Sequence, residues 1–528
     1  MIKQQKILGI ALSIFAVALL AVYFIFIGPL LKEAVGDPDS TLQIDEGEVE
    51  GANDRVMLFE YVERANMSSI EVHNEHGTYS FIRNKDGDFV IKGLESVAFD
   101  PKLFSTLVVD CGYTLSYVKV ANKNPQKLSD YGLDDESSPA YYILTTKEGK
   151  THKVYVGDKI PSNSGYYVRY EGRNTVYVLN TTIETTVLAP IEDFIVPTLI
   201  FPTTVNTYNL VDDFIIYSGA YWGDADNGIN IGDANETKKP IVRFHKIKDS
   251  EKHQFNQNET FYMQYPGDGV YTASGYVDAV AQQFVSYKGL KTVKVAPVDE
   301  DLKKYGILDA EYTLLFINND VTTENGKEKY TPVPNLLYFS KLQSDEEYGE
   351  YRYVYSVRFG IIAIVGEYDC EFLTYTLNKW VTDSLFSVNI DSVAEMKVQS
   401  GKLDATFTLE GSDTNLVVTD SSGKKIDTTN FRKFYQSALV LKKGGFADLT
   451  EDEMRALRED DSKISVKFTV KLRDGTERVF RFYSCGVQSY YTIDGEGEFY
   501  VATTELSKFV RDAERVLREE IVDSDSSW

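Results

Sequence analysis

The longest apolar run in the sequence lies at its start. Residues 7–31 contain no charged side chain, and Lys6 and Lys32 bracket them. At a rise of about 1.5 Å per residue, a helix of this length can cross a hydrocarbon layer about 30 Å thick. The pattern predicts a transmembrane anchor, which together with its cytoplasmic tip takes up residues 1–32.

The charges on either side of this run predict its orientation. Lys3 and Lys6 precede it, whereas Glu33 and Asp37 follow soon after. Because Lys and Arg stay on the cytoplasmic side, the N-terminus is expected in the cytoplasm and the bulk of the chain outside the cell membrane, as in a single-pass signal anchor. The alternative is a cleaved signal peptide with its site at residues 34–36, but the run exceeds the usual apolar length of about 7–15 residues.

Beyond an acidic stalk at residues 33–55, short strand-like runs alternate with segments of helical spacing. Asp100 followed by Pro101 is typical of a helix start, and Thr181 with Glu184 has the spacing of a capping box for a closing helix. Short turns between the runs favour an antiparallel meander. The strand-like runs lie at 70–73, 79–82, 89–91, 141–144, 152–156, 166–170 and 175–178.

The same order of elements returns further along the chain. The motif Leu-Ser-Asp-Tyr-Gly-Leu at residues 128–133 reappears at 302–307 as Leu-Lys-Lys-Tyr-Gly-Ile, and β-like runs and a helix follow each copy. A third, degenerate copy begins near Thr428, and a charged, capped helix at 449–453 replaces the motif there. An internal repeat of this length indicates related structural units arranged in series.

The sequence therefore predicts an α+β fold. An N-terminal transmembrane helix is followed by three repeated modules, each an antiparallel β-meander packed with helices. The modules are assigned to residues 56–200, 201–386 and 387–528. The second carries inserted loops at 222–239 and 318–334, and the third is degenerate.

Charge and cysteine content narrow the range of functions. Acidic residues outnumber basic ones by 80 to 55, and the formal net charge of -25 argues against a nucleic-acid partner. Cys111, Cys370 and Cys485 are far apart and each lies in an apolar run. They are expected to be small core residues, with no disulfide framework and no zinc site.

Two groups of residues resemble metal sites. His73 and His76 lie either side of a turn, with Glu71 and Glu75 nearby, but a site needs a further convergent ligand, and polar surface residues are the better interpretation. The loop from Asp224 to Asp233 has oxygen-bearing side chains at alternating positions, as calcium loops do. Its glycine comes one residue early and Asn235 stands where a glutamate is needed, so a surface turn is favoured and calcium binding stays open.

No catalytic pattern is found in the chain. The pairs Asp86-Gly87 and Asp474-Gly475 and the run at 494–497 lie between strand-like runs, where Asp-Gly is typical of hairpin turns. A phosphate-binding Walker A loop and the common nucleophile motifs are missing. No catalytic, cofactor-binding or metal residue is therefore assigned, and neither enzymatic activity nor a cofactor is expected.

Several of these motifs occur together in one known family. The N-terminal anchor, the Tyr-Gly motif at 128–133, and the strands at 153–157, 166–169 and 175–178 resemble the bacterial domain of unknown function 4340 family (DUF4340). The resemblance covers the first two modules well and the third only by pattern. It implies a membrane-anchored protein without established activity, associated with gliding-motility-type ABC transport systems.

These observations lead to one functional hypothesis and two alternatives. The first is a non-enzymatic, extracytoplasmic accessory or scaffold protein of an ABC-type transport or envelope system, with permease and ATPase subunits as partners. The second is an ectodomain that binds a cell-wall or extracellular polymer in grooves lined by Tyr166, Tyr167, Tyr353 or Tyr355. An envelope hydrolase is the third, although no nucleophile or carboxylate pair supports it.

Overall fold

A computed structural model describes most of the chain. It covers residues 44–51, 55–116, 119–121, 127–134, 140–201, 211–221, 240–252, 255–256 and 259–523. These residues form a mixed α+β structure with nine α-helices and several antiparallel sheets. The chain divides into two compact units, Met1–Val196 and Pro197–Trp528.

The first unit is built on one eight-stranded sheet, called sheet 1. Its strand order is β5-β4-β3-β8-β9-β10-β11-β7, and every pairing in it is antiparallel. A small second sheet holds β1 (Val49–Glu50), β2 (Val56–Met57) and β6 (Leu115–Ser116). The strands of sheet 1 are β3 (Met67–Asn74), β4 (Gly77–Arg83), β5 (Phe89–Ile91), β7 (Lys119–Ala121), β8 (Ala140–Thr146), β9 (Thr151–Lys159), β10 (Tyr166–Tyr170) and β11 (Val176–Leu179).

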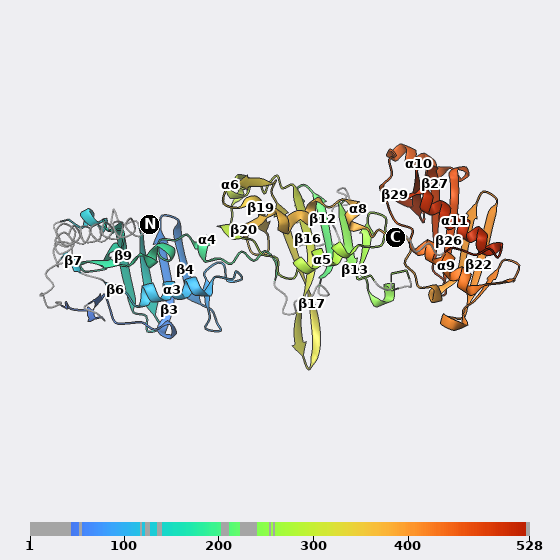
Figure 1. Cartoon of the computed structure of the whole chain (residues 1–528). Coiled ribbons are helices and arrows are strands. Elements are labelled where there is room, and N and C mark those ends of the chain that lie inside the picture. The colour runs from blue at the N-terminus through green and yellow to red at the C-terminus, as the bar shows by residue number, and fades with distance from the viewer. Residues whose placement is uncertain are drawn as a thin grey trace, which may run out of the picture. The chain divides into compact units, whose positions relative to one another are not determined.

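Helix α3 (Pro101–Gly112) lies across one face of sheet 1 (Figure 1). Asp100 caps it as the sequence predicts, because its side chain accepts hydrogen bonds from the backbone amides of Lys102 and Leu103. Phe104 packs against Phe81, with ring centroids 4.7 Å apart. The apolar stripe of the helix thus closes the core of the first unit.

The second unit contains two nine-stranded sheets. Sheet 2 has the order β14-β13-β12-β16-β17-β19-β20-β15, with β18 paired to β19. Its strands are β12 (Val211–Ser218), β13 (Val242–Lys246), β14 (Phe261–Tyr265), β15 (Lys291–Val295), β16 (Tyr312–Glu324), β17 (Lys327–Phe339), β18 (Gln343–Asp345), β19 (Gly349–Ser356) and β20 (Ile361–Gly366). Its helices are α5 (Gly275–Gln283), α6 (Asp299–Lys304), α7 (Glu367–Cys370) and α8 (Leu377–Trp380).

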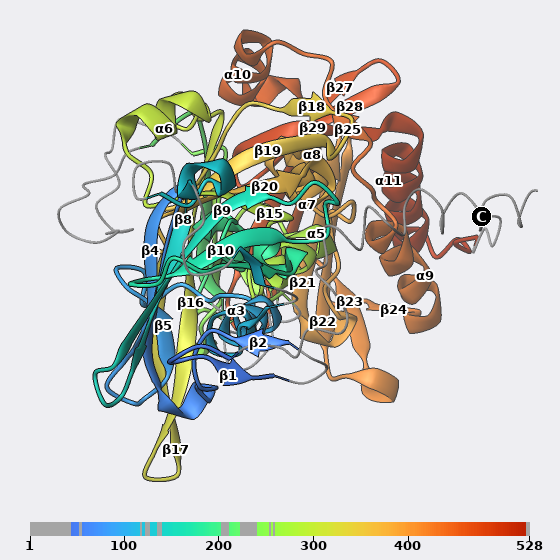
Figure 2. The same cartoon turned by 90° about the vertical axis from the view of Figure 1, so that its left-hand side faces the viewer.

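Sheet 3 follows with the order β24-β23-β22-β21-β26-β27-β28-β29-β25. Helices α9 and α11 pack side by side (Figure 2). The rings of Phe434 and Phe509 stack between them, with centroids 5.4 Å apart. The elements are β21 (Val393–Ser400), β22 (Leu403–Glu410), β23 (Val417–Asp420), β24 (Lys425–Ile426), α9 (Thr428–Leu439), β25 (Gly445–Phe446), α10 (Glu451–Glu459), β26 (Ile464–Leu472), β27 (Glu477–Cys485), β28 (Gln488–Ile493), β29 (Glu496–Ala502) and α11 (Thr503–Leu517).

The three large sheets share one strand order. Each begins with three strands that run outward to one edge, returns by a helix (α3, α5 or α9) to a short strand at the other edge, and fills the middle with a four-stranded meander. The Tyr-Gly motifs and α10 occupy the same place in this order, just before the meander. Sheet 3 differs by one additional edge strand, β24.

Sheets 2 and 3 share a continuous hydrophobic core. Lys443, which is buried, donates through Nζ to the carbonyl oxygens of Asn378 and Val381. Arg478 donates to the carbonyl oxygen of Gly269, 3.0 Å away. These contacts join β25 and β27 to the segments that flank α5 and α8, so the second unit is cohesive across both sheets.

The structure corrects two sequence-based predictions. Residues 318–334, expected to be an inserted loop, form the distal part of the β16–β17 hairpin, which projects from sheet 2 (Figures 1 and 2). Thr181 was expected to cap the closing helix, but Asn180 is the cap, and the segment is a 3-10 helix at Thr181–Thr185 followed by α4 (Ile191–Phe194). The predicted capping box is therefore wrong at this position.

Other predictions fall outside the described residues. These include the transmembrane anchor at 1–32, most of the acidic stalk, the loop at 222–239 and, within it, the calcium-like run from Asp224 to Asp233. Among the residues that are described, no helix is both long and apolar enough to span a membrane.

Candidate functional site

The outer face of each large sheet is the candidate functional surface. We define it as the face opposite the helices α3, α5 and α9. Successive side chains of a strand point to opposite faces, so outer-face residues alternate with core residues such as Val154 and Val156. The outer faces carry most of the aromatic and charged side chains that the sequence analysis singled out.

On sheet 1, the outer face carries a ladder of aromatic rings and cations across β3, β8, β9 and β10. His73 stacks on Tyr141 with ring centroids 4.8 Å apart. The Lys153 ammonium lies 4.3 Å from the centroid of Tyr141 and 4.6 Å from that of Tyr155. The Arg169 guanidinium lies 4.6 Å from the Tyr155 ring. Such cation–ring contacts stabilise a folded protein by about 0.5–1 kcal/mol each. The rings of Tyr141 and Tyr155 are therefore already in contact with cations of the same sheet.

The Tyr-Gly motif at 128–133 packs at one end of this face. It forms a 3-10 helix, Leu128–Tyr131, which ends at Gly132 in the left-handed conformation with φ 64°. Tyr131 meets the edge of Tyr167 at 5.0 Å, and Arg169 Nε donates to the carbonyl oxygen of Leu133. Gly157 lies directly beneath, since a Cβ there would approach the Tyr131 carbonyl oxygen to 2.2 Å. The motif is therefore a covering element for the sheet.

Sheet 2 repeats this arrangement with a larger apolar cover. Leu302 of α6 and Ile307 are buried in a second hydrophobic cluster on the outer face. Tyr305 meets the edge of Tyr353 at 4.9 Å, as Tyr131 meets Tyr167 in sheet 1. Tyr338 stacks against Tyr355 at 6.3 Å. The motif thus covers the outer face of the sheet in the same way in both units.

Of the four tyrosines proposed to line a groove, Tyr167, Tyr353 and Tyr355 lie on these outer faces. Tyr166 precedes Tyr167 on β10 and points to the opposite face, and all four are partly exposed. Tyr167, Tyr353 and Tyr355 contact other tyrosine rings, as described above. The Tyr166 hydroxyl donates a hydrogen bond to Glu184, 2.9 Å away. Burial is the main reason that the pKa of Tyr166 is raised to about 12, and this hydrogen bond adds to the increase. All four side chains are therefore engaged in contacts of their own sheet.

In sheet 3, α10 takes the place of the Tyr-Gly motif. The capping box predicted for Thr450 and Glu453 is confirmed. Arg458 of α10 lies 3.9 Å from Glu496 of β29. The remainder of this outer face carries Lys467 on β26 and Arg481 on β27, which are partly exposed. This outer face carries charges of both signs, because Glu395 on β21 and Glu477 on β27 lie on it as well.

The histidine group at the β3–β4 turn is spread over separate contacts. His73 Nδ1 lies 2.6 Å from Thr78 Oγ1, while His76 pairs with Glu75 at 3.6 Å. Glu71 accepts from Ser80 at 3.5 Å. Within the described part of the chain, no set of three or more His, Cys, Asp or Glu side chains is arranged to hold a metal ion.

The Asp-Gly pairs are hairpin turns, as predicted. Gly87 and Gly475 have φ values of 87° and 91°, which glycine adopts without strain. Asp494 accepts a hydrogen bond from the Val479 amide and sits at the turn between β28 and β29. These carboxylates shape turns and do not converge on one another.

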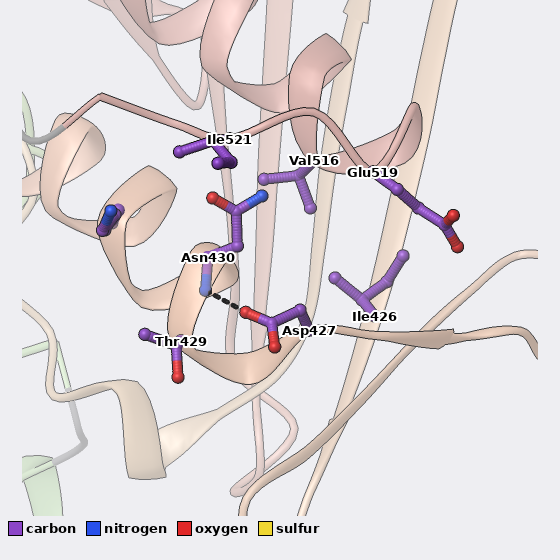
Figure 3. A pocket seen from close by; sticks show the side chains of 8 residues that line it. Ile426, Asp427, Thr429, Asn430, Val516, Glu519 and Ile521 are labelled. Carbon is purple, nitrogen blue, oxygen red and sulfur yellow. Dashed lines mark hydrogen bonds between the residues drawn. The ribbon is translucent and has the colours of Figure 1, made fainter.

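Two shallow grooves lie in the second unit. One, of about 350 Å³, lies between the start of α9 and the segment after α11, and Figure 3 shows Asn430 and Asp427 at its floor. Asp427 accepts from the Asn430 amide and so caps α9. The Asn430 side chain also accepts a hydrogen bond from the Val522 amide through Oδ1 and donates one through Nδ2 to the Glu520 carbonyl oxygen. Its polar groups are therefore used to hold the end of the chain on α9.

The second groove, of about 450 Å³, lies where α5 begins. Lys379 occupies its rim, 3.6 Å from the Tyr375 ring centroid and 3.0 Å from Glu371. Neither groove could be predicted from the sequence, because each joins residues that are about 90 or more positions apart.

Together, these features define a mixed α+β protein of antiparallel sheets with chemically distinct outer faces. Residues 111–213 match the model of the family described as Domain of unknown function (DUF4340), so this part of the chain is a DUF4340 domain. The match spans the end of α3, the Tyr-Gly motif and the meander β8–β11. No curated protein and no solved structure matches the chain.

Proposed function

We propose that the chain is a membrane-anchored, extracytoplasmic scaffold protein built from three copies of one module, without catalysis of its own. The observation that carries this proposal is the shared strand order of sheets 1, 2 and 3. Serial repeats of one unit create extended surfaces on which partners assemble. The apolar run at residues 7–31 supplies the anchor in this proposal.

The proposed partners are the permease and ATPase subunits of an ABC-type transport or envelope system. This link rests on the resemblance to the DUF4340 family, and the family match at residues 111–213 supports the resemblance itself. The chain has no Walker A motif, so ATP hydrolysis in such a system would come from a partner.

The outer faces are the proposed contact surfaces for these partners. On the core side, the sheets present a common framework of helices and buried apolar residues. On the outer side, the equivalent positions differ: Tyr155 on β9 corresponds to Tyr338 on β17 and Arg481 on β27, as the strand registers place them. A shared framework with different surfaces suits a scaffold that holds more than one partner.

Affinity purification from crosslinked membranes tests this function. The full chain is compared with a variant that lacks residues 1–32 and with a tagged, unrelated single-pass protein. We expect the full chain to recover permease and ATPase subunits above the unrelated control, and the anchorless variant to recover fewer. Recovery of neither subunit by the full chain would overturn the transport assignment.

A second candidate function is polymer binding by the ectodomain. The partly exposed tyrosines and cations of the outer faces favour it. In the same purification, cell-wall polymer recovered equally by the full chain and the anchorless variant, without transport subunits, would support this candidate instead.

A further inference from the structure

Two cations face each other on the outer face of sheet 3. Lys467 on β26 and Arg481 on β27 are direct cross-strand partners. Their neighbours along the strands, Val466, Phe468 and Phe480, are buried in the core, so both side chains project to the outer face. Side chains of such partners have Cβ atoms about 4.5–5.5 Å apart, and like charges there repel each other.

No carboxylate compensates this repulsion. In the residues that the structure describes, neither Lys467 nor Arg481 forms an ion pair. Asp404 on this face is already engaged, 3.3 Å from Lys397 Nζ and 3.2 Å from Gln399 Nε2. Glu395 and Glu477 lie further along the face, as the cross-strand partners of Lys471. A chain with a net charge of -25 thus leaves two adjacent cations without a counter-charge.

The equivalent positions of the other sheets hold no such pair. Sheet 1 places Tyr141 opposite Tyr155, and sheet 2 places Thr313 opposite Tyr338. In sheet 1, the nearby Lys153 ammonium lies over both tyrosine rings. The cation pair is therefore a property of sheet 3 and is not needed for the strand order that all three sheets share.

We propose that Lys467 and Arg481 form a binding site for the phosphate groups of an anionic, phosphodiester-linked polymer outside the membrane. The planar guanidinium forms paired hydrogen bonds with phosphate oxygens, and the ammonium adds a second point charge within reach of the same group. Lys397, on the neighbouring strand, is paired with Asp404, so the two cations alone supply the charge of the site. A polymer with one phosphate per unit presents a phosphate group to this pair. The inference goes beyond the scaffold role and rests on the extracytoplasmic location in the proposed function.

Binding of a synthetic poly(glycerol phosphate) oligomer to the full chain in nanodiscs tests the proposal. We compare the wild type with the double variant Lys467→Gln/Arg481→Gln. The matched control is Lys402→Gln/Lys471→Gln, which removes the same charge from the same sheet. We expect a loss of affinity of at least tenfold in the double variant, a change below twofold in the control, and weaker wild-type binding as salt rises.

Two further readouts separate a binding site from a structural role. Because the pair repels, the double variant is expected to unfold at the same temperature as the wild type or higher. Equal affinity of wild type and double variant would overturn the proposal. So would equally tight binding of a poly-glutamate peptide of the same charge, since the site would then recognise acidic peptides and not phosphate.

Discussion

Gly157 shows how a single position ties the Tyr-Gly motif to sheet 1. A methyl group there would come within 2.2 Å of the Tyr131 carbonyl oxygen and 2.9 Å of that of Gly132. Both neighbours are backbone atoms that cannot move aside cheaply. We predict that Gly157→Ala destabilises the first unit by about 2 kcal/mol, as overpacking in a core does. Gly275→Ala, where the space is open, is the control and should change the stability of its own unit little. Thermal unfolding measures both.

His152 gives the first unit a dependence on pH. It is buried, stacks on Phe59 at 4.0 Å, and burial together with Lys150 and Arg173 lowers its pKa to about 4. In the unfolded chain the imidazole titrates near its ordinary value of about 6.5. The stabilisation from the neutral ring is complete above pH 6.5 and is lost as the pH falls towards 4, by about 3 kcal/mol in all.

The corresponding prediction concerns the variant His152→Gln. Its free energy of unfolding should change less than that of the wild type between pH 6.5 and 4. Denaturant unfolding of the first unit at several pH values measures this. Parallel curves for the two proteins across that range would show that His152 does not cause the dependence.

Single residues were predicted from the sequence where their role is local. Asp100 and Thr450 were identified as helix caps because a cap depends on the next three residues alone. At residues 180–181 the same reasoning assigned the cap to Thr181 instead of Asn180, since the side chains of both residues can accept a hydrogen bond from a backbone amide. The Asn180 side chain accepts the hydrogen bond from the Thr182 amide, whereas Glu184 forms an ion pair with Lys159, 2.6 Å away.

At the scale of elements, the β16–β17 hairpin is the largest departure from the sequence-based expectation. Its distal residues, 322–332, are exposed on both faces and therefore lack the alternation of apolar and polar residues that marks a strand. Asn325 and Gly326, with φ values of 53° and 75°, form the tight turn that fixes its register. Pro332 and Pro334 lack the amide protons through which β17 could pair with a further strand there.

Shortening this hairpin should not affect the core. Removal of residues 323–324 and 327–328 leaves Thr322 opposite Lys329, a hydrogen-bonded pair like Glu324 and Lys327, joined by the same Asn-Gly turn, so the register is kept. Because the removed residues are exposed, we predict an unfolding temperature within about 2 °C of the wild type. Calorimetry measures this. A larger fall would mean that the projecting part stabilises sheet 2.

Helices and short strands were predicted more successfully than this hairpin. The helix that begins after Asp100 and the strands of the first meander appear at the predicted places, because each buries one face against a core. Their periodicity is therefore visible in the sequence. The single helix expected after the strands of the second copy is instead two short helices, α7 and α8, separated by a 3-10 turn.

At the scale of the whole molecule, the contacts between sheets 2 and 3 depend on Lys443. Burial lowers its pKa, and it donates to two carbonyl oxygens and lies 5.0 Å from the Phe499 ring. Removing the ammonium leaves buried acceptors without a donor. We predict that Lys443→Met destabilises the second unit by about 2–4 kcal/mol and separates the unfolding of the two sheets.

The neighbouring residue provides the control for this prediction. Lys442 is exposed, so Lys442→Met should leave one cooperative transition of nearly unchanged midpoint. Hydrogen exchange resolved by peptide distinguishes the outcomes. If residues 387–520 of Lys443→Met still exchange together with sheet 2, the lysine does not couple the sheets.

The sequence predicted the repeat of this molecule better than its surfaces. Two copies of the repeat could be identified because the Tyr-Gly motif is a short run of consecutive residues. The charged helix α10, which stands in place of the motif, marks where the third copy differs from the first two. The pairing of Lys467 with Arg481 depends on the register of one hairpin, and the contact of Arg478 with Gly269 joins residues that are 209 positions apart. Such contacts depend on strand order and register, which the pattern of apolar residues does not specify.

Site-specific photo-crosslinking in intact membranes tests the scaffold account most directly. A photoreactive residue is placed at exposed outer-face positions, Thr151 on β9 and Lys471 on β26, and at Val109 and Leu439 on the helix side as controls. The account predicts crosslinks to ABC permease or ATPase-associated subunits from the outer-face positions and few from the helix side. Crosslinks of equal yield from both sides, or none to any membrane subunit, would contradict it.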